Sequence, residues 1–172
     1  FNLLGPDAVP TNPLLGSGNV ARTATITVSE SQTNRGAAGL KDGTVFFPGA
    51  GDAPDNKEWM TNGQTVGANV HMSWSSPVTI DHIWLFDRAM AACPGNRTKA
   101  DELVAQITSG TLTFSDGSTI DITMALPDDS ATDGGVEIWF EPKTVTSLTF
   151  TVTSAASNGD KVGLAEMGVF QT

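Results

Sequence analysis

The chain carries few of the side chains that usually perform catalysis. It has one cysteine, Cys93, and two histidines, His71 and His82. A thiol acts as a nucleophile when a neighbouring base or a lowered pKa activates it, and pairing of Cys93 with either histidine is one interpretation. An inert or intermolecularly bridged thiol is the simpler one. The motifs of zinc proteases, serine hydrolases, phosphate-binding loops and dinucleotide-binding folds do not occur, so we predict no catalytic residues.

Carboxylates are more numerous, and nine of the nineteen fall in two loops and on late strand-like segments. They are Asp52, Asp55 and Glu58, then Asp128, Asp129 and Asp133, and finally Glu137, Glu141 and Glu166. A glycosidase needs two carboxyl groups roughly 5 to 10 Å apart across a cleft, and the spacing here does not supply that pair. Residues 129–134 are similar to a calcium loop but lack its middle ligand and its downstream glutamate. Solvated acids are therefore the simpler interpretation.

One tryptophan has a position that favours a binding role. Trp139 shares the parity of Glu137 and Glu141, whereas residues 136, 138 and 140 are apolar. Because side chains alternate between the two faces of a strand, we expect Ile138 in the core and Trp139 outside. An exposed indole beside acids could stack on the apolar face of a sugar. The alternative is a tryptophan that packs beneath a covering loop.

The elements that must position these residues are predicted to be β-strands. Alternating apolar residues and turn signals at regular intervals indicate about eight strands. We expect a bulge near Asp81 and His82, where the apolar parity changes, and a hairpin turn at Asp116-Gly117. The expected strands are residues 21–29, 70–74, 78–87, 112–115, 120–124, 136–140, 145–152 and 163–170.

Three segments depart from this pattern. The proline-rich residues 1–18 are expected to form an extended N-terminal arm. Residues 30–59 form a long irregular connection, of a kind that usually binds something or is tied down. Within residues 89–105, a capping-box variant at Thr98 predicts one short helix in an inserted loop. We expect residues 19–172 to form a single domain.

Composition agrees with an all-β domain. Of the 172 residues, 39% are hydrophobic and only 16% are charged, which is enough apolar material for a core. Eighteen glycines, nine prolines and many threonines and serines favour short strands and tight turns.

A net charge of −10 disfavours binding to nucleic acid or to anionic membranes, and no apolar run is long enough to insert into a membrane. Because the sequence begins with Phe1 and not with a methionine, we expect that a segment upstream has been removed.

Six short motifs follow one another along the chain in a characteristic order. They are Asn19–Arg22, Leu40–Gly43, Glu58–Trp59, Val78–Arg88, Leu112–Ser118 and Gly163–Met167. This order resembles the discoidin-like, or coagulation-factor C-type, branch of the galactose-binding-like jelly rolls, over residues 19–170. The resemblance implies an antiparallel jelly-roll β-sandwich of about eight strands. It also implies a secreted, extracellular module of the kind found alone or attached to carbohydrate-active enzymes.

The resemblance further implies a structural calcium ion. It places side-chain ligands at Asp42 and Glu166 and backbone carbonyl ligands at Leu40 and Thr44, an oxygen set that suits a hard cation. The alternative is that Asp42-Gly43 is an ordinary turn and that Glu166 is an edge-strand carboxylate. The ion is structural in such modules and not catalytic.

The resemblance places ligand contacts on loops at one end of the sandwich. Arg88 and Asp87 end a strand there, and with Trp139 and Glu58 they form the predicted ligand-binding set. A local ion pair of little energetic value is the alternative for Asp87-Arg88. The following residues, 89–105, are longer than the connection usual in the family and contain the glycosylation sequon at Asn96.

The function predicted from the sequence is a non-catalytic carbohydrate-binding module or lectin-like domain whose partner is a glycan or polysaccharide. Two alternatives remain open at this point. One is a protein-interaction or adhesion domain, which would present an apolar patch on the inserted loop. The other is an auxiliary domain of a longer, polysaccharide-active enzyme, for which Asp87, Asp101 and Glu58 are the candidate acids.

Overall fold

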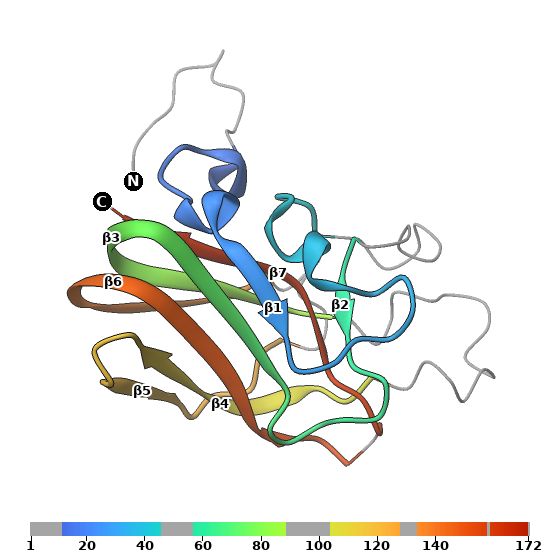
Figure 1. The fold of residues 1–172 in the computed structure, drawn as a ribbon. Helices are drawn as coiled ribbons and strands as arrows, with labels where there is room; N and C mark the ends of the chain where they lie inside the picture. Colours follow the sequence, from blue (N-terminus) through green and yellow to red (C-terminus); the bar gives the residue numbers. More distant parts are fainter. Residues whose placement is uncertain (1–11, 46–56, 89–103, 128–133, 158, 172) are drawn as a thin grey trace, which may run out of the picture.

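The computed structural model describes residues 12–45, 57–88, 104–127, 134–157 and 159–171 of the chain. These residues form seven strands and three short 3-10 helices (Figure 1). The strands are β1 (Thr25–Val28), β2 (Trp59–Met60), β3 (Asn69–Asp87), β4 (Ile107–Phe114), β5 (Thr119–Ile122), β6 (Val136–Ala155) and β7 (Gly163–Phe170). The 3-10 helices are η1 (Pro13–Leu15), η2 (Val20–Thr23) and η3 (Ala37–Lys41). Within the described residues, no helix is both long and apolar enough to span a membrane.

The strands pair antiparallel in the order β2-β7-β3-β6-β4-β5, with β1 also paired to β3. The two long strands, β3 and β6, belong to both layers of a sandwich. Residues 69–73 of β3 pair with β1 and with the later part of β6, and residues 78–87 pair with the earlier part of β6 and with β7. Figure 1 shows β3 and β6 turning back at the same edge of the molecule, where one layer continues into the other. The predicted all-β sandwich is confirmed.

The core lies between the two layers. Alternate residues of β3, β4, β6 and β7 point into it, as period-two burial requires. Its largest fully buried side chains include Trp59, Met72, Ile83, Leu85, Leu112, Leu148 and Phe150. Each such side chain stabilises the fold by about 1.5 to 3 kcal/mol relative to exposure. A smaller apolar cluster, made of Leu14, Phe86, Ala165 and Phe170, lies outside this core.

Several predicted elements agree with the structure. The hairpin is present as β4 and β5, and Gly117 at its turn has a φ of 81°, which favours glycine. The register of β3 against β6 shifts between Ile80 and His82, so the predicted bulge is confirmed. The closing strand spans residues 163–170 as predicted.

Other predicted boundaries differ. Residues 70–74 and 78–87 lie in one strand, β3, and residues 136–140 and 145–152 lie in one strand, β6, so the described residues have seven strands. Residues 20–23 form η2 because the Asn19 side chain accepts a hydrogen bond from the Ala21 N–H and caps the turn. The described part of the expected extended arm contains η1, capped by Asn12. The predicted helix at Thr98 lies outside the described residues, as do Cys93 and Asn96.

Candidate functional site

Three aromatic rings form a stack across three neighbouring strands, and we call it the ring column. It consists of Phe170 on β7, His82 on β3 and Trp139 on β6. His82 lies directly opposite both Phe170 and Trp139 in the strand registers, so the three side chains share one face of the layer. The ring centroids of His82 and Trp139 are 3.9 Å apart at 18°, and those of His82 and Phe170 are 4.8 Å apart at 4°.

Trp139 forms the exposed end of the ring column. Its side chain is 59% exposed although His82 covers one face of the indole, so the opposite face is open to solvent. The strand registers explain this exposure, because residues 136–145 of β6 pair with β3 alone among the described strands. Ile138 packs against the core instead. The predicted parity, with Ile138 inside and Trp139 outside, is confirmed.

Carboxylates flank the imidazole of His82 at both of its nitrogen atoms. Nδ1 lies 2.6 Å from Oδ1 of Asp81, and Nε2 lies 3.7 Å from Oε1 of Glu137. Asp81 and His82 are both buried, whereas Glu137 and Glu141 are exposed beside Trp139. The hydrogen bond to Asp81 fixes the rotation of the imidazole. The ring of His82 that supports Trp139 is therefore held in position before any ligand binds.

The other predicted ligand-binding residues form a separate, buried network. Arg88 is 3% exposed and Glu58 is 1% exposed, and Nε of Arg88 lies 2.7 Å from Oε2 of Glu58. Asp87 is fully buried, and its two carboxylate oxygens accept hydrogen bonds from the N–H groups of Arg88 and Ile107, each at 3.0 Å. The network therefore joins the end of β3 to β4 and to the segment before β2.

The structure thus brings three of the four predicted ligand-binding residues together but leaves Trp139 apart from them. Trp139 lies opposite His82, and Arg88 lies six residues further along the chain from His82. At about 3.3 Å per residue, that separation is roughly 20 Å. The ring column and the buried network are two different places on β3.

Glu166 and Asp42, the two predicted metal ligands, lie close enough to influence each other. Glu166 is fully buried on β7, and its Oε1 accepts a hydrogen bond from the Gly43 N–H at 3.2 Å. Its Oε2 has no hydrogen-bond partner in the described residues. Burial raises the pKa of the Glu166 carboxyl to about 8; the Gly43 N–H opposes this rise, and the negative charge of Asp42 adds to it.

Asp42 has partners of its own. Its Oδ1 accepts a hydrogen bond from the Thr44 N–H at 2.9 Å, and its Oδ2 lies 2.8 Å from Nζ of Lys57. The hydrogen bond and the charge of Asp42 raise the pKa of Lys57. An unpartnered buried carboxylate oxygen beside a second carboxylate fits the donor chemistry of a hard cation. No cluster of three or more His, Cys, Asp or Glu occurs in the described residues, so backbone carbonyls such as those of Leu40 and Thr44 would have to complete the set.

Sequence reasoning missed two members of the ring column and the lysine that pairs with Asp42. In the sequence analysis, His82 is named only at the bulge and as a possible partner of Cys93, and neither Phe170 nor Lys57 is singled out. Phe170 and Trp139 are 31 residues apart in sequence, and only the pairing of both strands with β3 brings their rings into one stack. The outward parity of Trp139 was the one available signal.

Comparison with known families identifies the chain at the family level. A family model described as "Domain of unknown function (DUF7402)" matches residues 19–170. The chain belongs to this family. A search of curated proteins found no match.

Solved structures share the fold of this DUF7402 domain. The lectin domain of lectinolysin, complexed with Lewis B antigen, is 15% identical with a TM-score of 0.63, and the match covers 92% of this chain and 99% of that one. The family 32 carbohydrate-binding module of C. perfringens NanJ, in complex with galactose, is 11% identical with a TM-score of 0.62, covering 90% and 98%. A Streptococcus pneumoniae fucose-binding module is 13% identical with a TM-score of 0.62, covering 90% and 95%. The predicted jelly-roll β-sandwich fold is thereby confirmed.

Proposed function

We propose that this DUF7402 domain is a secreted, non-catalytic carbohydrate-binding module of the discoidin-like type, which binds a glycan on the open face of Trp139. The observation that carries the proposal is the ring column, because it presents an exposed indole on a fixed aromatic support. The fold supports it as well, since structures of the same fold are a lectin domain complexed with Lewis B antigen and modules that bind galactose or fucose.

The chemistry around Trp139 suits a sugar. The C–H face of a pyranose is apolar and packs on an indole, while its hydroxyl groups require hydrogen-bond acceptors at the rim. Glu137 and Glu141 lie on the same strand, two residues to either side, and both are exposed. Ionised carboxylates accept strong hydrogen bonds from hydroxyl groups. The same acids, together with a net charge of −10, favour neutral glycans over anionic ones.

The buried network of Arg88, Asp87 and Glu58 is assigned to the architecture in this proposal. Side chains that are at most 3% exposed offer almost no surface to a glycan. Their hydrogen bonds to one another and to the backbone of Ile107 instead fix the end of β3. The sequence predicts that these three residues contact the ligand. In this proposal, the glycan instead contacts Trp139 and the acids beside it.

A structural calcium ion at Asp42 and Glu166 forms part of the proposal. Glu166 lies on β7, and Asp42 follows η3, so an ion held by both would tie the loop after η3 to the sheet. The unpartnered Oε2 of Glu166 supports this role. The ion would neutralise two carboxylates that otherwise repel each other, and it would stabilise the fold without any part in chemistry.

A glycan array probed with the purified domain, with and without a chelator, tests this function. We expect binding to a set of neutral glycans, and we expect the chelator to lower the melting temperature more than it changes which glycans are bound. Hits would then be measured by titration calorimetry with the free oligosaccharide. An array on which no glycan is bound above background, by a protein that melts cooperatively, would contradict the proposal.

A further inference from the structure

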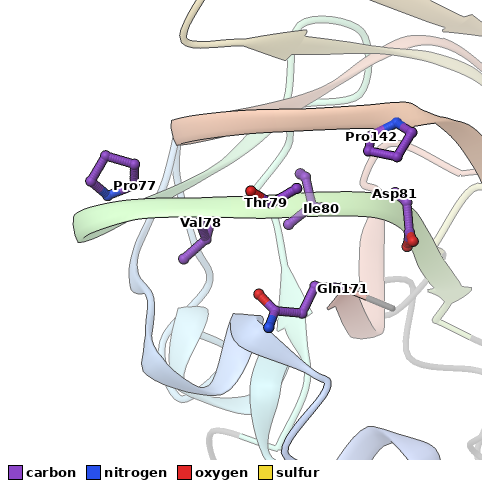
Figure 2. Close-up of a pocket in the computed structure, with 7 residues that line it drawn as sticks. All are labelled: Pro77, Val78, Thr79, Ile80, Asp81, Pro142 and Gln171. Carbon is purple, nitrogen blue, oxygen red and sulfur yellow. The ribbon is translucent and has the colours of Figure 1, made fainter.

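A pocket of about 380 Å³ opens beside the ring column (Figure 2). It is lined by residues 77–81 of β3, by Pro142 of β6 and by Gln171, which follows β7. In Figure 2, Val78, Asp81 and Gln171 lie on the same side of the β3 ribbon, and Pro142 projects from the neighbouring strand. Nothing in the sequence-based site prediction included this place.

The pocket lies at a register shift between β3 and β6, where the extra residues belong to β6. Ile80 pairs with Lys143 and His82 pairs with Trp139, so Asp81 alone faces residues 140–142 of β6. A ladder with one residue opposite three cannot stay regular. Pro142 lacks an N–H group and cannot close the gap with a further ladder bond. The two strands therefore separate locally.

The lining suits one sugar ring. Pro77, Val78 and Pro142 supply apolar walls, while Asp81 and Gln171 supply carboxylate and amide groups; the hydroxyl of Thr79, a further lining residue, is hydrogen-bonded to that of Thr144. A few convergent polar groups among apolar walls are typical of small-molecule sites, whose volumes begin at about 300 Å³. The lining includes a carboxylate and no cationic side chain, so the pocket favours a neutral, hydroxylated ligand.

Asp81 connects the pocket to the ring column. Its carboxylate lines the pocket and also lies 2.6 Å from Nδ1 of His82, the ring on which Trp139 stacks. Thr79 lies three residues before His82, which is roughly 10 Å along an extended strand, and Trp139 lies opposite His82 on the neighbouring strand β6. A ligand that reaches both the pocket and the open face of Trp139 must therefore be longer than one sugar ring.

We propose that this pocket is a second subsite, which holds a further sugar ring of a neutral oligosaccharide whose other ring stacks on Trp139. The inference rests on the proposed function, and it adds the size of the ligand: the domain recognises an oligosaccharide and not an isolated monosaccharide. Linking two weak contacts through one ligand raises the overall affinity without a new contact at either site.

The test compares mono-, di-, tri- and tetrasaccharides built from galactose, fucose, glucose and N-acetylglucosamine. The substitution Thr79→Phe introduces a bulky ring at an exposed strand position of the pocket. Thr113→Phe is the control, because Thr113 is also exposed, on β4, and lies outside the pocket lining. Gln171→Ala is the second variant, which removes an amide from an exposed side chain and leaves the backbone hydrogen bond to Gly18 in place.

Titration calorimetry of the wild type should give at least tenfold tighter binding of one of the longer saccharides than of its component monosaccharides. Thr79→Phe should remove that advantage and leave monosaccharide affinity unchanged, and Gln171→Ala should reduce it in the same direction. Thr113→Phe should bind as the wild type does. Equal affinity of the wild type for mono- and oligosaccharides, or wild-type oligosaccharide binding by both pocket variants, would overturn this inference alone. A wild-type domain that binds none of these saccharides would overturn the proposed function with it.

Discussion

Neighbouring residues on β6 have opposite roles, and stability measurements separate them. Trp139 projects to solvent from the ring column, and Ile138 packs against the core. We expect Ile138→Ala to lower the free energy of unfolding by about 2 kcal/mol, the lower end for such truncations because Ile138 is only partly buried. Trp139→Ala should cost about 1 kcal/mol, the value of one aromatic pair with His82. Urea denaturation measures both, and an equal or larger loss for Trp139→Ala would make that tryptophan a packing residue.

The Arg88–Glu58 pair allows a second prediction at the scale of single residues. Arg88→Ala would leave Glu58 buried and without its cation, which typically costs about 3 to 5 kcal/mol. The control is Lys143→Ala, because Lys143 lies 3.9 Å from the half-exposed Asp116 and such pairs contribute less than about 1 kcal/mol. Chemical denaturation of both variants checks the difference. Similar small losses for the two would contradict a structural role for Arg88.

At the scale of elements, the junction between β7 and the loop after η3 should make stability depend on pH. The pKa of Glu166 is about 8 in the folded chain against 4.5 for the ordinary group. The native state therefore keeps a proton that the unfolded state releases between these values. This stabilisation is fully present below about pH 4.5 and is lost as the pH rises towards 8, by at most about 1.4 kcal/mol per pH unit.

Thermal melts in chelator across that pH range, for the wild type and for Glu166→Gln, test this prediction. The wild type should lose stability relative to Glu166→Gln as the pH rises, because glutamine does not titrate. Addition of calcium at the upper end of the range should restore the wild type and not the variant. Parallel pH profiles for the two proteins, with no response to calcium, would show that Glu166 is neither the titrating group nor a metal ligand.

The elements also show how far the sequence predicts the structure. The hairpin turn at Asp116-Gly117 and the parity of β6 depend on neighbouring residues, so local patterns suffice for them. Residues 70–74 and 78–87 are predicted as two strands, yet β3 continues through residues 75–77 and pairs with β6 on both sides of a register shift. Strand pairing between distant segments is not a local property. For the same reason, the ring column and the pocket at the bulge could not be predicted, although the bulge itself was.

At the scale of the whole molecule, the acidic charge should set the class of glycan. With a net charge of −10 and acids beside Trp139, we expect sialylated and sulfated glycans to bind at least tenfold more weakly than their neutral counterparts at low salt. Added salt should narrow this difference, because it screens exposed charges. Calorimetry at two ionic strengths measures the effect. Tighter binding of the anionic glycans would place the ligand on a different surface.

A glycan that covers the open face of Trp139 should protect the indole from a quencher, and tryptophan fluorescence tests this coverage most directly. The chain has four tryptophans; Trp59 and Trp74 are buried and Trp84 is partly buried, so Trp139, at 59% exposure, is the most accessible to a quencher. Acrylamide quenching would be measured with and without a saturating amount of the tightest neutral oligosaccharide. We predict that the sugar shields the accessible emission, and that Trp139→Phe lacks both that emission and its shielding. Unchanged quenching of the wild type at saturation would contradict the claim.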